Sequence, residues 1–186
     1  MPQVYELNPI FLQSGDPETE DTATLQAPGT LGARFTVRQP AITGTPVTTN
    51  ANYRAKRYQL VQTDSGMALP PFANAVAWWS DQGRYIVTTL PTLRGRIAGR
   101  FCRAVATLGD YCCIQIGGWG VVKFVDAPTA QPTTAGLDVI GSATAGKADC
   151  LAAASAPTYA LLGVSCGTYD APNAQCLVDL QVPETV

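Results

Sequence analysis

The stretch 109–126 holds two segments of alternating residues on either side of the tetrapeptide Gly-Gly-Trp-Gly at 117–120. Within 112–116 a cysteine and two isoleucines occupy every second position, so they fall on one face of an extended chain. The glycines predict a chain reversal, because glycine tolerates the positive φ angles of tight hairpin turns. The segment 121–125 would then return as a second strand. This hairpin is the predicted centre of an all-β core.

Short alternating segments separated by turn residues recur along most of the chain, and no segment has a convincing helical period. Ser-Asp-Gln-Gly at 80–83 predicts a second hairpin turn between two of them. Strands this short and this closely spaced predict an all-β fold, an antiparallel sandwich or barrel. Besides the central hairpin, the expected strands are 33–38, 53–63, 72–79, 84–89, 96–107, 137–140, 148–153, 159–166 and 174–182.

The length of 186 residues suits one domain with an appended arm. Residues 1–30 are predicted to form an extended N-terminal arm, because four prolines interrupt them. Residues 31–186 are the expected β domain, and 104–110 is a candidate point for subdividing it.

The arm combines an acidic stretch with an apolar cluster. Residues 16–21 (DPETED) contain four acids, whereas Tyr5, Ile10, Phe11 and Leu12 are apolar or aromatic. A solvated tail is one interpretation. An apolar cluster in a tail also favours an arm that lies on a neighbouring subunit, because exposed apolar groups cost solubility unless they dock. The four apolar residues are therefore candidate interface residues.

Only 14% of the residues are charged, against about 25% in an ordinary globular protein. A surface of small neutral groups suits packing against another protein better than it suits nucleic acid. The net charge of −2 agrees, because nucleic-acid binding usually needs a basic footprint. Neither a signal peptide nor an apolar run of membrane-spanning length is recognisable, so we expect a soluble protein made in a cytosol.

Basic residues are concentrated between 34 and 103, with acidic segments on both sides. Such a distribution favours internal charge pairing between the segments, and the alternative is a basic face that meets an acidic partner. For the second interpretation the candidate contacts are Arg94, Arg96 and Arg100.

The chain contains no histidine, which removes Ser-His-Asp and Cys-His catalysis and most metal hydrolases. The triplet Asp64-Ser65-Gly66 matches aspartic proteases, but no second copy exists and a plain turn is the preferred interpretation. The glycines at 117–120 are not followed by a phosphate-binding lysine or a helix. We therefore expect no enzyme activity, no cofactor and no metal.

Six cysteines occur, at 102, 112, 113, 150, 166 and 176. Reduced thiols that pack as small apolar groups are the preferred interpretation, and disulfides formed after release from a cell are the alternative. Cys112 and Cys113 are neighbours on a predicted strand, so their side chains should point to opposite faces.

Trp78 and Trp79 are also adjacent on a predicted strand, so their side chains must diverge. One is expected in the core, and the other becomes a candidate for a subunit interface or a ligand site.

Two groups of motifs and a tail segment occur in a recognisable order along the chain. They are 57–68 (RYQLVQTDSGMA), 76–81 (VAWWSD), 85–89 (YIVTT), 99–101 (GRF), 109–118 (GDYCCIQIGG), 121–124 (VVKF), 141–146 (GSATAG), 156–159 (APTY) and 162–164 (LGV). Together they resemble tailed-phage capsid decoration (cement) proteins, small β proteins on the outer face of an icosahedral head. The resemblance covers about residues 55–182.

The resemblance implies a virion structural protein whose copies clamp adjacent capsid subunits. Its partners would be the major capsid protein and neighbouring copies of itself, with no direct contact to nucleic acid or membrane. It would be made in the host cytoplasm and located on the outer surface of the capsid. The alternative is a head-fibre or adhesin-like carbohydrate-binding β module that uses exposed aromatic residues.

Overall fold

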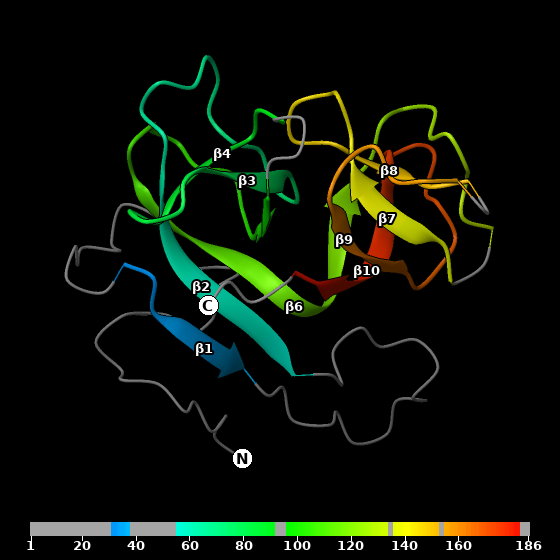
Figure 1. The fold of residues 1–186 in the computed structure, drawn as a ribbon, viewed down its shortest axis with the longest axis horizontal. Coiled ribbons are helices and arrows are strands. Elements are labelled where there is room, and N and C mark those ends of the chain that lie inside the picture. Colours follow the sequence, from blue (N-terminus) through cyan, green and yellow to red (C-terminus); the bar gives the residue numbers. More distant parts are fainter. Residues whose placement is uncertain (1–30, 38–54, 92–95, 134–135, 153–154, 183–186) are drawn as a thin grey trace.

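The computed structural model describes residues 31–37, 55–91, 96–133, 136–152 and 155–182, which form ten β-strands (Figure 1). The described residues contain no helix, which confirms the all-β class. The strands are β1 (Arg34–Val37), β2 (Lys56–Thr63), β3 (Val76–Asp81), β4 (Ile86–Thr88), β5 (Ile97–Phe101), β6 (Tyr111–Lys123), β7 (Asp138–Gly141), β8 (Ala148–Cys150), β9 (Leu161–Ser165) and β10 (Gln175–Gln181).

The strands form one sheet in the order β1-β2-β4-β3-β5-β6-β10-β9-β7-β8. β2 also pairs with β6, and this additional pairing closes β2, β4, β3, β5 and β6 into a barrel. The last four strands extend the sheet from β6, on the right of Figure 1. A barrel with an extension is therefore the form that the predicted β fold takes. Its strand pairs are antiparallel except β2 with β4, which are parallel.

β6 is one continuous strand of 13 residues, so the predicted hairpin at 117–120 is wrong. The first half of β6 pairs with β2 and the second half with β10, and both pairings include Gly117. Gly118 has a φ of 79°, and a Cβ on it would lie 2.5 Å from the carbonyl oxygen of Ala55. Gly118 thus lets the backbone of Ala55 approach β6 closely, at the point where β6 bends from its partner β2 toward its partner β10.

The hairpin predicted around 80–83 is confirmed, because β3 and β4 are antiparallel neighbours. Its turn lies two residues later than expected, at 82–85. Tyr85 ends that turn with a φ of 56°, a conformation that non-glycine residues seldom adopt.

β5 is shorter than the strand expected at 96–107. Residues 102–110 instead form the loop that joins β5 to its barrel neighbour β6. The predicted arm, residues 1–30, lies outside the described residues.

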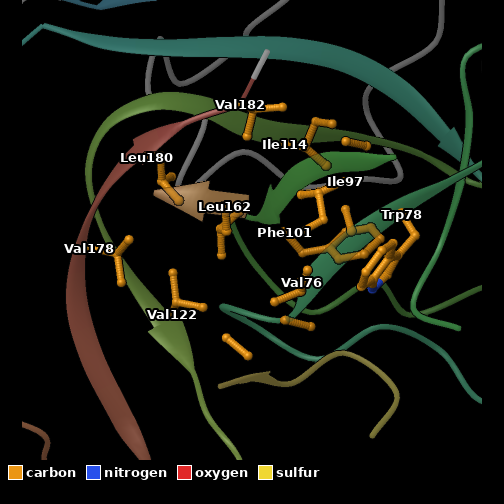
Figure 2. Packing of buried hydrophobic residues seen from close by; sticks show 14 of the residues in the cluster. Val76, Trp78, Ile97, Phe101, Ile114, Val122, Leu162, Val178, Leu180 and Val182 are labelled. Carbon is orange, nitrogen blue, oxygen red and sulfur yellow. The ribbon is translucent and has the colours of Figure 1, made fainter. Parts of the chain in front are cut away.

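The main hydrophobic core is continuous between the barrel and the extension. Figure 2 shows Phe101 and Ile114 of the barrel in one cluster with Leu162 and Leu180 of the extension, and Trp78 belongs to the same cluster. A second cluster, on the other face of β2 and β6, contains Phe35, Tyr58, Leu60, Cys102 and Cys113.

Both central strands of the barrel are therefore buried on two faces. Cys112 belongs to the main core and Cys113 to the second cluster, so their side chains diverge as predicted. Both faces of β6 are covered at 112–116, so the alternation there does not separate a buried face from an exposed one.

A buried polar network holds the bend of β6. The Gln115 side chain is fully buried, and its amide nitrogen donates to the carbonyls of residues 117–119 at 3.0–3.2 Å. Its Oε1 accepts a hydrogen bond from Arg100 Nε at 2.8 Å, and Arg100 Nη1 donates to Asn74 Oδ1 at 2.7 Å. The network thus connects β5 and β6 with the loop before β3.

Gly163 of β9 offers a direct test of the extension. A Cβ at this position would overlap the carbonyl oxygen of Asp179 in β10, and backbone atoms cannot swing aside as a long side chain does. We expect Gly163→Ala to lower the free energy of unfolding by about 1–3 kcal/mol. Gly167→Ala is the matched control, because a Cβ there meets nothing within 4 Å. Urea denaturation of both variants measures the difference, and equal stability would contradict this packing.

Candidate interaction surface

Three large apolar side chains are exposed on two loops beside the barrel. Leu69 is 75% exposed, Leu90 is 51% exposed and Phe72 is 37% exposed. We refer to these three residues as the loop surface. Leu161, at the start of β9 in the extension, is a fourth exposed apolar residue, at 41%.

The two loops are tied to each other and to their neighbours. Thr89, next to Leu90, donates its N–H to the sulfur of Met67 at 3.3 Å, and Met67 is buried. Gly146 donates its N–H to the Thr89 carbonyl at 2.8 Å, and a Cβ on Gly146 would lie 3.0 Å from the Phe72 ring. Fixed loops present their apolar groups with little ordering cost on binding, which favours a role as an interface.

The sequence around the loop surface is also free of charge. The segments 65–80, 85–91, 104–109 and 139–146 contain no Asp, Glu, Lys or Arg. Depletion of charge and enrichment of apolar and aromatic residues is what distinguishes the centre of a protein–protein interface from ordinary surface. The sequence analysis did not identify Leu69 and Leu90 as candidate interface residues, although the absence of charge in 65–80 and 85–91 can be seen in the sequence.

Asp64 begins a turn directly after β2, at the start of the loop that carries Leu69 and Phe72. This is the turn that the sequence predicted for the triplet Asp64-Ser65-Gly66. Ser80 Oγ donates to Asp64 Oδ2, and the N–H of Gly66 donates to Asp64 Oδ1 at 2.8 Å. The Ser80 hydroxyl, followed by the Gly66 N–H, lowers the pKa of the Asp64 carboxyl. The carboxylate of Asp64 therefore has a structural role: its hydrogen bonds connect the turn to β3.

The two adjacent tryptophans differ in burial, although Trp79 also packs against the main core. Trp78 is fully buried in the main core, which confirms that one of the pair is a core residue. Trp79 is half-buried and packs edge-on against Tyr85, with 6.4 Å between the ring centroids. An interface role for Trp79 stays a prediction.

Arg100 is only 2% exposed and is held by Gln115 and Asn74, so it serves the interior of the domain. This corrects the expectation that it lies on an exposed contact face. Arg96 is exposed. Outside the described residues lie Tyr5, Ile10, Phe11, Leu12 and Arg94.

A cavity of about 340 Å³ lies in the extension, between β7, β8 and the segment that leads to β9. Hydroxyl groups, the half-buried Tyr159 and the carboxylate of Asp149 line it. Both carboxylate oxygens of Asp149 already accept hydrogen bonds, Oδ1 from the N–H groups of Thr129 and Cys150 and Oδ2 from Thr129 Oγ1.

Within the ranges that the structure describes, no group of three or more His, Cys, Asp or Glu side chains is placed to hold a metal ion. The same residues include no helix that is long and apolar enough to cross a membrane. Comparison of the chain with protein-family models, with curated proteins and with solved structures found no match.

Proposed function

We propose that this chain is a structural protein of a phage virion, a capsid decoration protein that binds the outer face of the head and stabilises the capsid lattice. The observation that carries the proposal is the uncharged loop surface, presented by fixed loops on a β-barrel. The sequence resemblance to capsid decoration proteins, which spans the barrel and the extension, supplies the class of partner.

Binding in this proposal is driven by burial of apolar area. Full burial of a leucine or phenylalanine side chain is worth about 1.5–3 kcal/mol, and the loop surface offers three such side chains. A single contact of this kind is weak, but a lattice presents many equivalent sites. The partners are the major capsid protein and neighbouring copies of this chain, and the protein acts without cofactor or catalysis.

Further contacts are proposed for residues that the sequence singled out. Trp79 is half-buried, and Arg96 is exposed. Tyr5, Ile10, Phe11 and Leu12 would anchor the N-terminal arm on a neighbouring subunit.

Capsid binding by a charged variant tests the proposal. In the double variant Leu69→Asp, Leu90→Asp, two carboxylates would be buried without partners on binding, so we expect at least ~10-fold weaker association with purified capsids. Leu161→Asp is the control for a carboxylate placed elsewhere, because it adds one of the two charges of the double variant at an exposed leucine of the extension. Co-sedimentation with capsids measures the affinity. Equal binding by wild type and the double variant would place the contact elsewhere, and no binding by wild type would exclude the function.

The cavity beside Tyr159 favours a second candidate function, a carbohydrate-binding module. Its volume of about 340 Å³ accommodates a single sugar ring, and an aromatic side chain among hydroxyl groups suits such a ligand. Binding to a glycan array without affinity for capsids would favour this function.

A further inference from the structure

Two cysteines of the barrel lie opposite each other on neighbouring strands. β5 pairs with β6 in the register Arg100↔Gln115 and Phe101↔Ile114. The next pair in this register is Cys102 and Cys113, and the N–H of Cys102 donates to the carbonyl oxygen of Cys113 at 3.4 Å. Opposed residues of a hydrogen-bonded antiparallel pair have Cα atoms about 5.5 Å apart and side chains on the same face. A disulfide requires about 4.4–6.8 Å, a range that contains the distance expected for such a pair.

The side chains of the two cysteines share one environment. Both belong to the cluster on the outer face of β2 and β6, with exposed fractions of 7% for Cys102 and 5% for Cys113. Cys102 is followed by the half-buried Arg103 and the exposed Ala104, which gives a small oxidant a route to it.

Cys112 is the competing partner, because it adjoins Cys113 in the sequence. Its side chain is 1% exposed and packs in the main core, on the opposite face of β6. Burial raises the pKa of the Cys112 thiol, with smaller contributions from Cys102 and Asp110. Cys112 is therefore disfavoured by the direction of its side chain, which lies in a different cluster from those of Cys102 and Cys113.

We propose that Cys102 and Cys113 form an oxidative cross-link site, at which a peroxide converts two thiols into a disulfide between β5 and β6. In the first step the Cys102 thiolate attacks hydrogen peroxide: a sulfur–oxygen bond forms, the oxygen–oxygen bond breaks and one water leaves after proton transfer. In the second step the Cys113 thiolate attacks the sulfenic sulfur, the sulfur–sulfur bond forms and the oxygen leaves as a second water. The two sulfurs are oxidised by two electrons and the peroxide is reduced.

The cross-link would join the two ends of the loop between β5 and β6. It would thereby restrict the motion of this loop, which contacts the segment that carries Leu69 and Phe72. Val105 in this loop donates its N–H to the carbonyl of Pro71 at 3.0 Å, and Pro71 adjoins Phe72. The chemistry goes beyond the proposed function and does not depend on it.

Mass spectrometry of peroxide-treated protein tests the site without loss of the fold. Trypsin cleavage after Arg100, Arg103 and Lys123 places Cys102 in the peptide 101–103 and both Cys112 and Cys113 in the peptide 104–123. We expect these two peptides to be linked, with the loss of two hydrogen atoms, in wild type and in Cys112→Ser. In Cys113→Ser the link should disappear. Fragmentation of the wild-type linked peptide between Cys112 and Cys113 gives the same assignment if a variant does not fold.

Thermal melting provides a second readout. A native disulfide constrains the unfolded chain, so peroxide treatment should raise the Tm of wild type and Cys112→Ser but not that of Cys113→Ser. A link that persists in Cys113→Ser, a link assigned to Cys112 by fragmentation, or sulfonic acids without a link at Cys102 would each overturn the proposal.

Discussion

Replacement of Trp78 by alanine is expected to lower the free energy of unfolding by about 3–5 kcal/mol. The indole is fully buried and packs edge-on against Tyr159, with 6.2 Å between the ring centroids. Its ring also covers Gly141 so closely that a Cβ there would overlap it. The indole N–H has no hydrogen-bond partner among the described residues, so the expected loss comes from packing alone.

Trp79→Ala is the matched comparison for Trp78→Ala. Trp79 is half-buried, so its removal should cost clearly less stability, while association with capsids should weaken by roughly 2 kcal/mol if it anchors an interface. Thermal or urea denaturation measures the first effect and capsid co-sedimentation the second. Equal losses of stability in the two variants would show that the strand is buried equally on both faces.

The variant Gln115→Leu is expected to destabilise the protein by about 3 kcal/mol, although it keeps the size of the side chain and adds apolar character. It removes the acceptor of Arg100 Nε and the donor to the carbonyls of residues 117–119; the bonds to Arg100 and Gly117 are buried, and those to residues 118 and 119 are partly buried. Buried polar groups that lose their partners cost about 1–3 kcal/mol each, and more when one carries a charge.

Gln59→Leu is the control for this prediction, because Gln59 is also buried but its side-chain nitrogen donates at 3.3 Å to Gly32. Its expected cost is about 1 kcal/mol. Urea denaturation compares the two variants, and hydrogen exchange should show faster opening of residues 117–120 in Gln115→Leu alone. Equal stability of the two variants would mean that water replaces the lost partners of Gln115.

Period-two alternation predicted most strands correctly, because it follows from local geometry. β1, β2, β4, β5, β8, β9 and β10 each lie within a predicted segment, and β7 extends one residue beyond its segment. The same local signals failed at 117–120, where glycines typical of a turn occur inside a strand. The reason is tertiary: Gly117 faces the Arg57 side chain and Gly120 faces that of Arg100, so each leaves room for a group from a distant part of the sequence.

In the candidate site, too, local geometry was predictable from the sequence and tertiary contacts were not. Strand geometry predicted that the two tryptophans would differ in burial, whereas only the fold shows that Trp78 is the fully buried one. Arg100 looked like a surface residue because arginine usually is one, and only the fold brings Gln115 and Asn74 to it. The loop surface combines loops that are adjacent only because Thr89 meets Met67 and Gly146.

The shared strand β6 has a consequence for the order in which the molecule can assemble. Its second half pairs with β10, more than fifty positions further along the chain at Lys123↔Gln175. During synthesis the barrel strands are available well before β10, so the segment 117–123 waits with an open edge, and unpaired edges recruit strands from other chains. Pairings across such sequence distances also fold slowly. At high expression we therefore expect the unpaired edge of 117–123 to promote aggregation until β10 has been synthesised, unless the chains are dilute or bound by a chaperone.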